Sequence, residues 1–294
     1  TEPELTVGTK LFTRETKLKQ LLQSIPETVD RVIVADDGPV NAADRDVFNL
    51  VNDRLDLTVL NLEADAGLGA GRQAILEECG SDYLCIVDTD MEVPTNVTTL
   101  VDILDATPSL GGLSGFLRES GELTGLFHDL YETADGDLLI RDVREEKERV
   151  STAGGDYVPF NFVPNAAVFR TECLRDYGWD TEYVIGREHL DFYLGHWKQT
   201  EWKFGVCPDV AFPHYPGGST SYMDDRRSSL KLRASRAYFR EKWGYHSVIG
   251  VDDWLGRMKG DRPLHPLPTP PMPLRWQARL KRARQSVEET LGLT

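Results

Sequence analysis

Apolar runs that predict β-strands alternate with helical stretches over the first part of the chain, and this alternation restricts the fold more than any other feature. After the first strand, leucines and an isoleucine recur at helical spacing from Leu18 to Ile25. The predicted strands cover residues 5–12, 31–35, 57–62 and 83–87. The pattern predicts an α/β fold with a mostly parallel central sheet flanked by helices and joined by right-handed crossovers. Ligands of such sheets bind beyond the carboxyl ends of the strands.

Acidic residues follow two of these strands at that edge. Asp36-Asp37-Gly38 ends the second strand, and Asp88-Thr89-Asp90 ends the fourth. A divalent cation that bridges two phosphates takes hard oxygen ligands, often only one or two protein carboxylates. The earlier pair has the chemistry to accept hydrogen bonds from a nucleobase or a ribose. Turn formation and helix capping are the structural alternatives for both clusters.

A glycine-rich segment, Gly67-Leu-Gly-Ala-Gly-Arg72, follows the third strand and opens a helix. Its backbone N–H groups and the Arg72 guanidinium suit a phosphate or a nucleotide. A dinucleotide fingerprint would require glycine where Arg72 stands, so that interpretation is excluded.

Taken together, these motifs resemble those of family 2 glycosyltransferases in order and spacing, over about residues 5 to 216. The resemblance continues through four later segments, which are residues 163–170, Tyr177-Gly-Trp-Asp180, Glu188-His-Leu-Asp191 and 207–214. It implies a GT-A fold, in which a Rossmann-like half binds the nucleotide and a second half binds the acceptor.

The resemblance also implies roles for single residues. Asp36 and Asp37 would bind the nucleoside. Asp90 would ligate Mn²⁺ or Mg²⁺ most directly, and Asp88 would contact ribose or metal-bound water. His214 matches a histidine that supplies a further metal ligand in many relatives, although a lone histidine after a strand also has structural uses. The donor would be a nucleotide-diphospho-sugar, with UDP-sugars favoured.

The catalytic base is left open among three residues of one helix. The family commonly has adjacent Glu-Asp where this chain has Glu188-His189-Leu190-Asp191. Residues three apart share a helix face, so Glu188 and Asp191 are both expected to face the acceptor. Inversion needs a carboxylate that takes the acceptor proton. Asp191 is the preferred candidate, Glu188 the second and His189 the third.

Two further groups of residues have both functional and structural interpretations. Arg226 and Arg227 lie in a polar stretch, residues 217–229, that is either a cover for the bound diphosphate or a solvated loop. Trp179, Trp197 and Trp202 supply either core packing or a stacking surface for a sugar.

Composition limits the partners and the setting. The net charge of −15 opposes binding to nucleic acid, and the acidic, arginine-rich composition suggests a halophilic source. The four cysteines form no C-x-x-C pair and are expected to be buried thiols. The sequence shows no membrane-spanning run and no secretion signal, so a cytoplasmic protein is expected.

The chain divides into a catalytic domain and a tail. Residues 1–261 form the expected GT-A domain, with the nucleotide-sugar half at about 1–110 and the acceptor half at about 111–261. Within 262–294, prolines crowd residues 263–273, and a basic amphipathic helix follows them. This helix would touch the inner face of a membrane peripherally, or pack on the domain or on a second subunit. The oligomeric state is open.

The resulting prediction is a metal-dependent, inverting glycosyltransferase acting on a glycan, a lipid-linked or a protein acceptor. A sugar nucleotidyltransferase is a rival, but it would need a stronger phosphate loop near the first strand than Val7-Gly8-Thr9-Lys10. A non-catalytic nucleotide-sugar-binding protein is the second rival, because it would keep the same fold.

Overall fold

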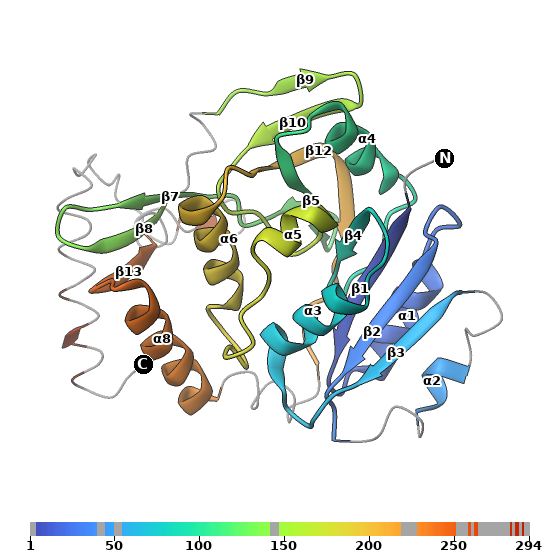
Figure 1. Ribbon diagram of the computed structural model, residues 1–294, viewed down its shortest axis with the longest axis horizontal. Coiled ribbons are helices and arrows are strands. Elements are labelled where there is room, and N and C mark those ends of the chain that lie inside the picture. Colours follow the sequence, from blue (N-terminus) through green and yellow to red (C-terminus); the bar gives the residue numbers. More distant parts are fainter. Residues whose placement is uncertain are drawn as a thin grey trace.

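A ten-stranded mixed sheet forms the centre of the protein, shown in the computed structural model of Figure 1. The structure describes residues 4–39, 45–49, 55–141, 147–218 and 228–250, and a few positions beyond them: 258–259, 262–263, 283, 286–287 and 290. The strands of the sheet are β1 Leu5–Leu11, β2 Arg31–Asp36, β3 Leu57–Asn61, β4 Tyr83–Ile86, β5 Leu110–Glu119, β6 Glu122–Thr124, β9 Val150–Thr152, β10 Gly155–Pro159, β11 Ala167–Arg170 and β12 Lys203–Pro213.

The strand order is β3-β2-β1-β4-β11-β5-β12-β10-β9, with β6 paired to β5. Strands β1 to β4 are parallel, and β5 is parallel to β12. Because β11 is antiparallel to both β4 and β5, those two strands point in the same direction. The predicted α/β fold with a mostly parallel sheet is confirmed, and the carboxyl ends of β1, β2, β4, β5 and β12 meet at one edge.

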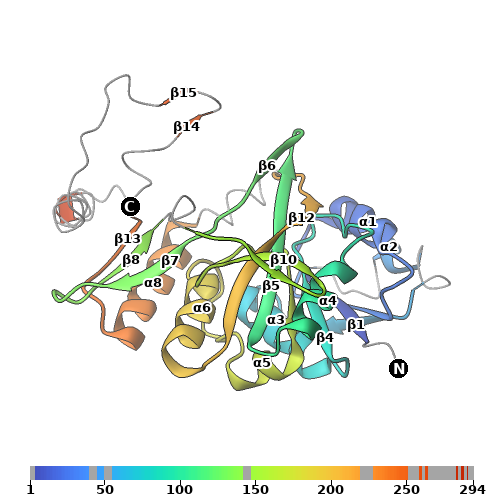
Figure 2. The same cartoon turned by 90° about the horizontal axis from the view of Figure 1, so that it is seen from above.

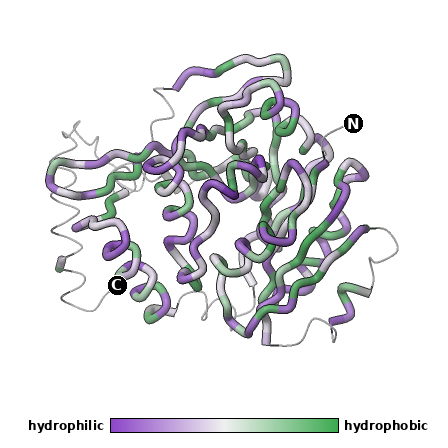
Figure 3. Tube along the Cα trace, in the orientation of Figure 1, coloured by the Kyte–Doolittle hydropathy of each residue, from purple (hydrophilic) through white to green (hydrophobic). Residues whose placement is uncertain are grey.

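Helices cover both faces of the sheet, and Figure 2 shows α1 and α2 on one side with α3, α5 and α6 on the other. Alternate residues of a strand point to opposite faces. In β2, Val32 and Val34 belong to the core beneath α1 and α4, whereas Ile33 and Ala35 belong to the core beneath α3 and α6. Figure 3 shows these apolar strands as the hydrophobic centre. The helices are α1 Glu15–Ser24, α2 Asp46–Asn49, α3 Gly67–Glu78, α4 Thr98–Ala106, α5 Thr171–Asp176, α6 Glu188–Gln199 and α8 Ser229–Trp243.

A small second sheet lies beside α6 and α8 (Figure 1). The turn residues Asp135-Gly136-Asp137 predict an antiparallel hairpin with strands at 126–131 and 138–143. The structure confirms it as β7 Asp129–Glu132 and β8 Asp137–Arg141, joined through Gly136 at a φ of 80°. Strand β13, Ser247–Gly250, pairs in parallel with β8. Such a long-range pairing has no local sequence signal.

Strand β12 positions part of the candidate site. The sequence predicts a strand near residues 204–207, but the strand in the structure extends over residues 203–213, with a register shift between Val206 and Ala211. Beyond it, His214 forms an isolated antiparallel bridge with Met91. The end of β12 therefore runs directly past the Asp88-Thr89-Asp90 turn.

The predicted proline-rich linker and tail helix lie outside the described residues, apart from a few isolated positions and the short strands β14 Met258–Lys259 and β15 Arg262–Pro263. Within the described part of the chain, no helix has both the length and the apolar character that crossing a membrane requires. All four cysteines are buried and unpaired, as predicted.

Candidate active site

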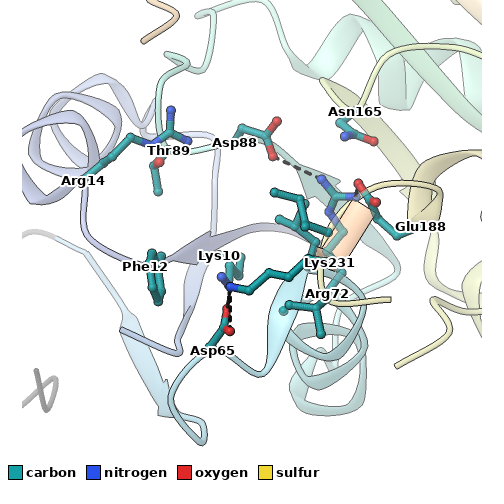
Figure 4. Close-up of a pocket in the computed structure, with 14 residues that line it drawn as sticks. Lys10, Phe12, Arg14, Asp65, Arg72, Asp88, Thr89, Asn165, Glu188 and Lys231 are labelled. Carbon is teal, nitrogen blue, oxygen red and sulfur yellow. Dashed lines mark hydrogen bonds and ion pairs between the residues drawn. The ribbon is translucent and has the colours of Figure 1, made fainter. Parts of the chain in front are cut away.

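A pocket of about 100 Å³ lies at the carboxyl ends of β1 and β4, where α3, α6 and α8 begin (Figure 4). Residues from far apart in the sequence line it, because the parallel strands bring their carboxyl ends to the same edge. The lining residues are Lys10, Phe12, Arg14, Asp65, Gly67, Leu68, Arg72, Asp88, Thr89, Asn165, Val184, Ile185, Glu188 and Lys231.

Positive charge is concentrated in this pocket. Four cationic side chains of the described residues line it, in a chain whose net charge is −15. Three carboxylates accompany them, and Lys231 pairs with one of these, Asp65, at 2.7 Å. Lysine and arginine side chains gathered at one edge of the sheet are the donors that binding a diphosphate requires.

Arg72 lies at the centre of the lining. The Gly67-to-Arg72 segment forms the first turns of α3, and a Cβ on Gly67, whose φ is 99°, would come within 2.3 Å of the Val184 Cα. The guanidinium is only 2% exposed, bonds to Asp88 at 3.2 Å and lies 3.9 Å from Glu188. Its Nη1 has no hydrogen-bond acceptor among the described residues. A buried N–H group facing a pocket without an acceptor favours a bound anion or oxygen-rich ligand there.

Asp36 and Asp37 lie beneath the pocket and do not line it. Asp36 is paired with the buried Arg45 at 2.7 Å. Asp37 is fully buried, accepts a hydrogen bond from the Gly67 N–H at 2.8 Å and pairs with Lys10 at 2.5 Å. Burial raises the pKa of Asp37 above its ordinary value, although Lys10 opposes the shift. Both carboxylates thus have partners inside the protein.

Several lining residues were not identified from the sequence, including Phe12, Arg14, Asp65, Asn165 and Lys231. For two of these residues, their position in the sequence could have indicated that they line the pocket. Phe12 and Arg14 directly follow β1, and β1 lies between β2 and β4, which carry the two acidic clusters. Lys231 comes from α8, and no local pattern connects that helix to this edge of the sheet.

Asp90 and His214 come together as predicted. The Asp90 carboxylate is 5% exposed, lies 3.7 Å from the His214 Nε2 and pairs with Arg14. Burial opposes ionisation of Asp90, but the interaction with His214 and the charge of Arg14 outweigh it and lower its pKa. The interaction with Asp90, followed by the hydrogen bond with Glu119 at 2.7 Å, raises the pKa of His214.

This pair is compatible with a divalent cation, although it is not a complete metal site. No group of three or more His, Cys, Asp or Glu side chains capable of holding a metal occurs among the described residues. Mg²⁺ and Mn²⁺ in nucleotide sites usually take one or two protein carboxylates and complete their coordination with phosphates and water. Asp88, the third predicted contact, is 29% exposed and bonded to Arg72. Asp90 and His214 therefore have suitable donor atoms, and Arg14 occupies the same Asp90 oxygen.

Of the three candidate bases, only Glu188 lines the pocket. It is the first residue of α6 and is 8% exposed. His189 donates its Nε2 hydrogen to the Val163 carbonyl at 2.7 Å. Burial, with a smaller effect of Arg72, lowers the pKa of His189 to about 3, so this imidazole stays neutral.

Asp191, the preferred candidate, does not line the pocket beside Glu188. Asp191 is 0% exposed, and its carboxylate accepts hydrogen bonds from Tyr177, Tyr183, Lys242 and Trp243 at 2.7–3.0 Å. Positions three apart on a helix still diverge by about 60°. That difference turns Asp191 towards α8, which supplies Lys242 and Trp243.

Replacing Asp191 with Asn is therefore expected to destabilise the fold. The amide cannot pair with Lys242 and cannot accept all four hydrogen bonds. We expect a loss of about 2–4 kcal/mol in the free energy of unfolding. The loss should lie towards the lower end of this range because the Lys242 side chain is partly exposed to solvent. Denaturant unfolding measures this loss, and Asp102→Asn at an exposed position of α4 serves as the control. An unchanged stability together with a large loss of catalytic rate would restore Asp191 as the base.

The predicted contacts from Arg226 and Arg227 fall outside the described residues. Of the three tryptophans considered for sugar stacking, Trp179 is core: it is 4% exposed and stacks on Phe192 with ring centroids 4.8 Å apart.

Comparison with solved structures confirms the class of fold. The structure of S. aureus TarS residues 1–349 matches with a TM-score of 0.51 and 18% identity, over 72% of this chain and 60% of that one. The mannosyltransferase PcManGT from Pyrobaculum calidifontis, in complex with GDP-Man and Mn²⁺, matches with a TM-score of 0.52 and 14% identity, over 82% and 65%. S. aureus TarS 1–349 in complex with UDP-GlcNAc matches with a TM-score of 0.50 and 18% identity, over 74% and 60%. These are GT-A glycosyltransferases.

The sequence profile of glycosyl transferase family 2 matches residues 6–163, more than half of the chain. The chain belongs to glycosyl transferase family 2. No curated protein matches the sequence significantly. The chain spans about 60% of the length of the TarS 1–349 structures that it resembles.

Proposed function

We propose that this chain transfers a sugar from a nucleotide-diphospho-sugar, with a UDP-sugar as the first choice, to an acceptor hydroxyl with inversion. One observation carries the proposal. The pocket at the carboxyl edge of the sheet gathers Lys10, Arg14, Arg72 and Lys231 around a buried carboxylate, Glu188, in a strongly acidic protein. Family membership and the UDP-GlcNAc and GDP-Man complexes of structurally similar proteins support it.

The donor would lie across the ends of β1 and β4. Phe12 offers an aromatic face on which the nucleobase would stack, and the surrounding cations would pair with the diphosphate. Asp36 and Asp37 would support donor binding without touching the donor. They hold Arg45, Lys10 and the Gly67 N–H in position. Arg72 would direct its unsatisfied Nη1 at the donor.

Glu188 would act as the base. The acceptor hydroxyl loses its proton to this carboxylate while its oxygen attacks the anomeric carbon, and the nucleoside diphosphate leaves from the opposite face. Arg72, 3.9 Å away, orients the carboxylate. The same cations stabilise the negative charge that develops on the leaving diphosphate.

A divalent cation, Mn²⁺ or Mg²⁺, would be held by Asp90 and His214, with Asp88 nearby. When bound, it supplies additional charge neutralisation for the diphosphate. Arg14 must then release the Asp90 oxygen that it now occupies.

In this proposal, residues of about 1–110 bind the donor and residues of about 111–261 bind the acceptor. The acceptor class (glycan, lipid-linked or protein), a cytoplasmic location and a peripheral membrane contact through the tail belong to the same proposal.

A donor screen tests the function. We expect UDP to bind more tightly with Mn²⁺ than without it in calorimetry, and we expect release of UDP from at least one UDP-sugar. GDP-Man is included as a competing donor. Pyrophosphate-dependent formation of a nucleoside triphosphate would instead identify a nucleotidyltransferase. Tight binding without hydrolysis or transfer of any donor, across a panel of glycan acceptors, would identify a binding protein.

A further inference from the structure

A second cavity, of about 170 Å³, lies on the α6 face of the sheet, near the starts of β5 and β12. Among the residues that the structure describes, none lines both this cavity and the pocket at the carboxyl ends of β1 and β4, which is called the donor pocket below. Helix α6 connects the two sites, because Glu188 at its start lines the donor pocket, whereas Tyr193 and Trp197 line the cavity. From Glu188 these two residues lie about 7 and 14 Å along the helix axis.

Aromatic rings form much of the cavity wall. Trp197 is 37% exposed, and Trp202 and Tyr157 also line the cavity. The Trp202 Nε1–H donates to Asp176 at 2.7 Å, so the orientation of that ring is set by the protein. These rings offer flat apolar surfaces at the cavity.

Polar residues also line this cavity. The Tyr193 hydroxyl is buried and has no hydrogen-bond partner among the described residues, although burying such a group is costly. Asp129 pairs with Lys147, and its other oxygen accepts a hydrogen bond from the Asn161 N–H at 3.0 Å. Asp129, Lys147, Asn161 and Tyr193 all line the cavity. The site thus combines apolar faces with a fixed set of donors and acceptors.

We propose that this cavity binds one pyranose ring of a glycan, at a site distinct from the donor pocket. A pyranose has an apolar C–H face, which suits the tryptophan surface, and hydroxyls around its edge, which suit Tyr193, Asp129 and Lys147. The small volume holds a single ring and is below the range of pockets for drug-sized ligands. This inference goes beyond the proposed transfer reaction and does not depend on it.

Saccharide binding without donor or metal provides the test. The probes are the methyl α- and β-pyranosides of glucose, galactose, mannose and N-acetylglucosamine, with uridine as the competing class. Saturation-transfer NMR and tryptophan fluorescence titrations measure binding. For a ligand of this size we expect a Kd on the order of 1 mM for at least one glycoside.

Two variants locate the site. Tyr193→Phe removes only the unsatisfied hydroxyl, so we expect an unchanged or higher Tm together with a roughly 2- to 10-fold weaker Kd. Trp197→Ala should weaken binding by about tenfold or more, because the stacking surface is lost. Tyr131→Phe, the same chemical change at an exposed tyrosine on β7, is the matched control and should leave the Kd unchanged.

Three results would overturn the proposal. They are the absence of saturable binding by every glycoside, preferential binding of uridine, and glycoside binding that neither the Tyr193 nor the Trp197 substitution weakens. Because donor and metal are omitted, none of these results depends on whether the chain transfers sugars.

Discussion

Glu188→Gln is expected to lower kcat for sugar transfer by about 10² to 10⁴, the range typical of general acid–base catalysis. The amide keeps the size of the side chain but cannot take the acceptor proton. Arg72 still has Asp88 as a partner, so donor binding should survive. Steady-state kinetics and UDP calorimetry on the same preparations separate the two effects. Loss of a transition-state interaction lowers kcat, whereas loss of uniform binding raises KM.

The matched control for this experiment is Glu182→Gln, an exposed carboxylate in the loop that leads to α6. It should leave kcat and KM unchanged. If Glu188→Gln raises only the acceptor KM, then Glu188 positions the acceptor and is not the base. His189 cannot take over the role of the base near neutral pH, because burial holds its pKa at about 3 and it does not accept a proton there.

Asp90→Ala is expected to lower transfer by at least about 10³-fold, because the diphosphate loses a metal-mediated counter-charge worth several kcal/mol. It should also abolish the strengthening of UDP binding by Mn²⁺ in calorimetry, a result that does not depend on turnover. The removal of Asp90 takes away the carboxylate partner of Arg14, and we expect Arg14 to compensate partly by pairing with phosphate directly. Donor affinity in the absence of metal should therefore fall less than activity does.

Asp102→Ala, which removes an exposed carboxylate from α4, is the control for loss of charge. Near-normal transfer by Asp90→Ala, or full activity of the unaltered protein in excess EDTA, would rule out a metal at this position. In that case Arg14 and His214 would remain the partners of Asp90, and the Arg14–Asp90 pair would be a permanent part of the site.

The local sequence pattern was sufficient to predict most of the strands and helices around the site. The strand at 31–35 is confirmed as β2, the helix that carries residues 188–191 as α6, and the hairpin around Asp135-Gly136-Asp137 as β7 and β8. The meeting of Asp90 with His214 also followed from sequence, through the family resemblance. The bridge between Met91 and His214 shows how it is achieved, with the end of β12 running alongside the acidic turn.

The choice among the three candidate bases shows where local pattern fails. Helical spacing places Glu188 and Asp191 on related faces, but it carries no information about what packs against each face. Helix α8 begins after residues that carry no clear signal, and it supplies Lys242 and Trp243 to Asp191. Long-range packing of α8 therefore buries the carboxylate that the sequence favoured.

The sequence by itself determined the α/β architecture, the acidic turns at the strand ends and the glycine-rich start of α3, because these depend on periodicity and on residues close together in the chain. Only the tertiary structure decided which side chains reach the pocket. It placed Asp36 and Asp37 beneath the pocket, brought in Phe12 and Lys231, and left Glu188 as the carboxylate of α6 that lines it. The physical reason is that burial and charge pairing depend on neighbours supplied by distant segments, and no local spacing specifies those neighbours.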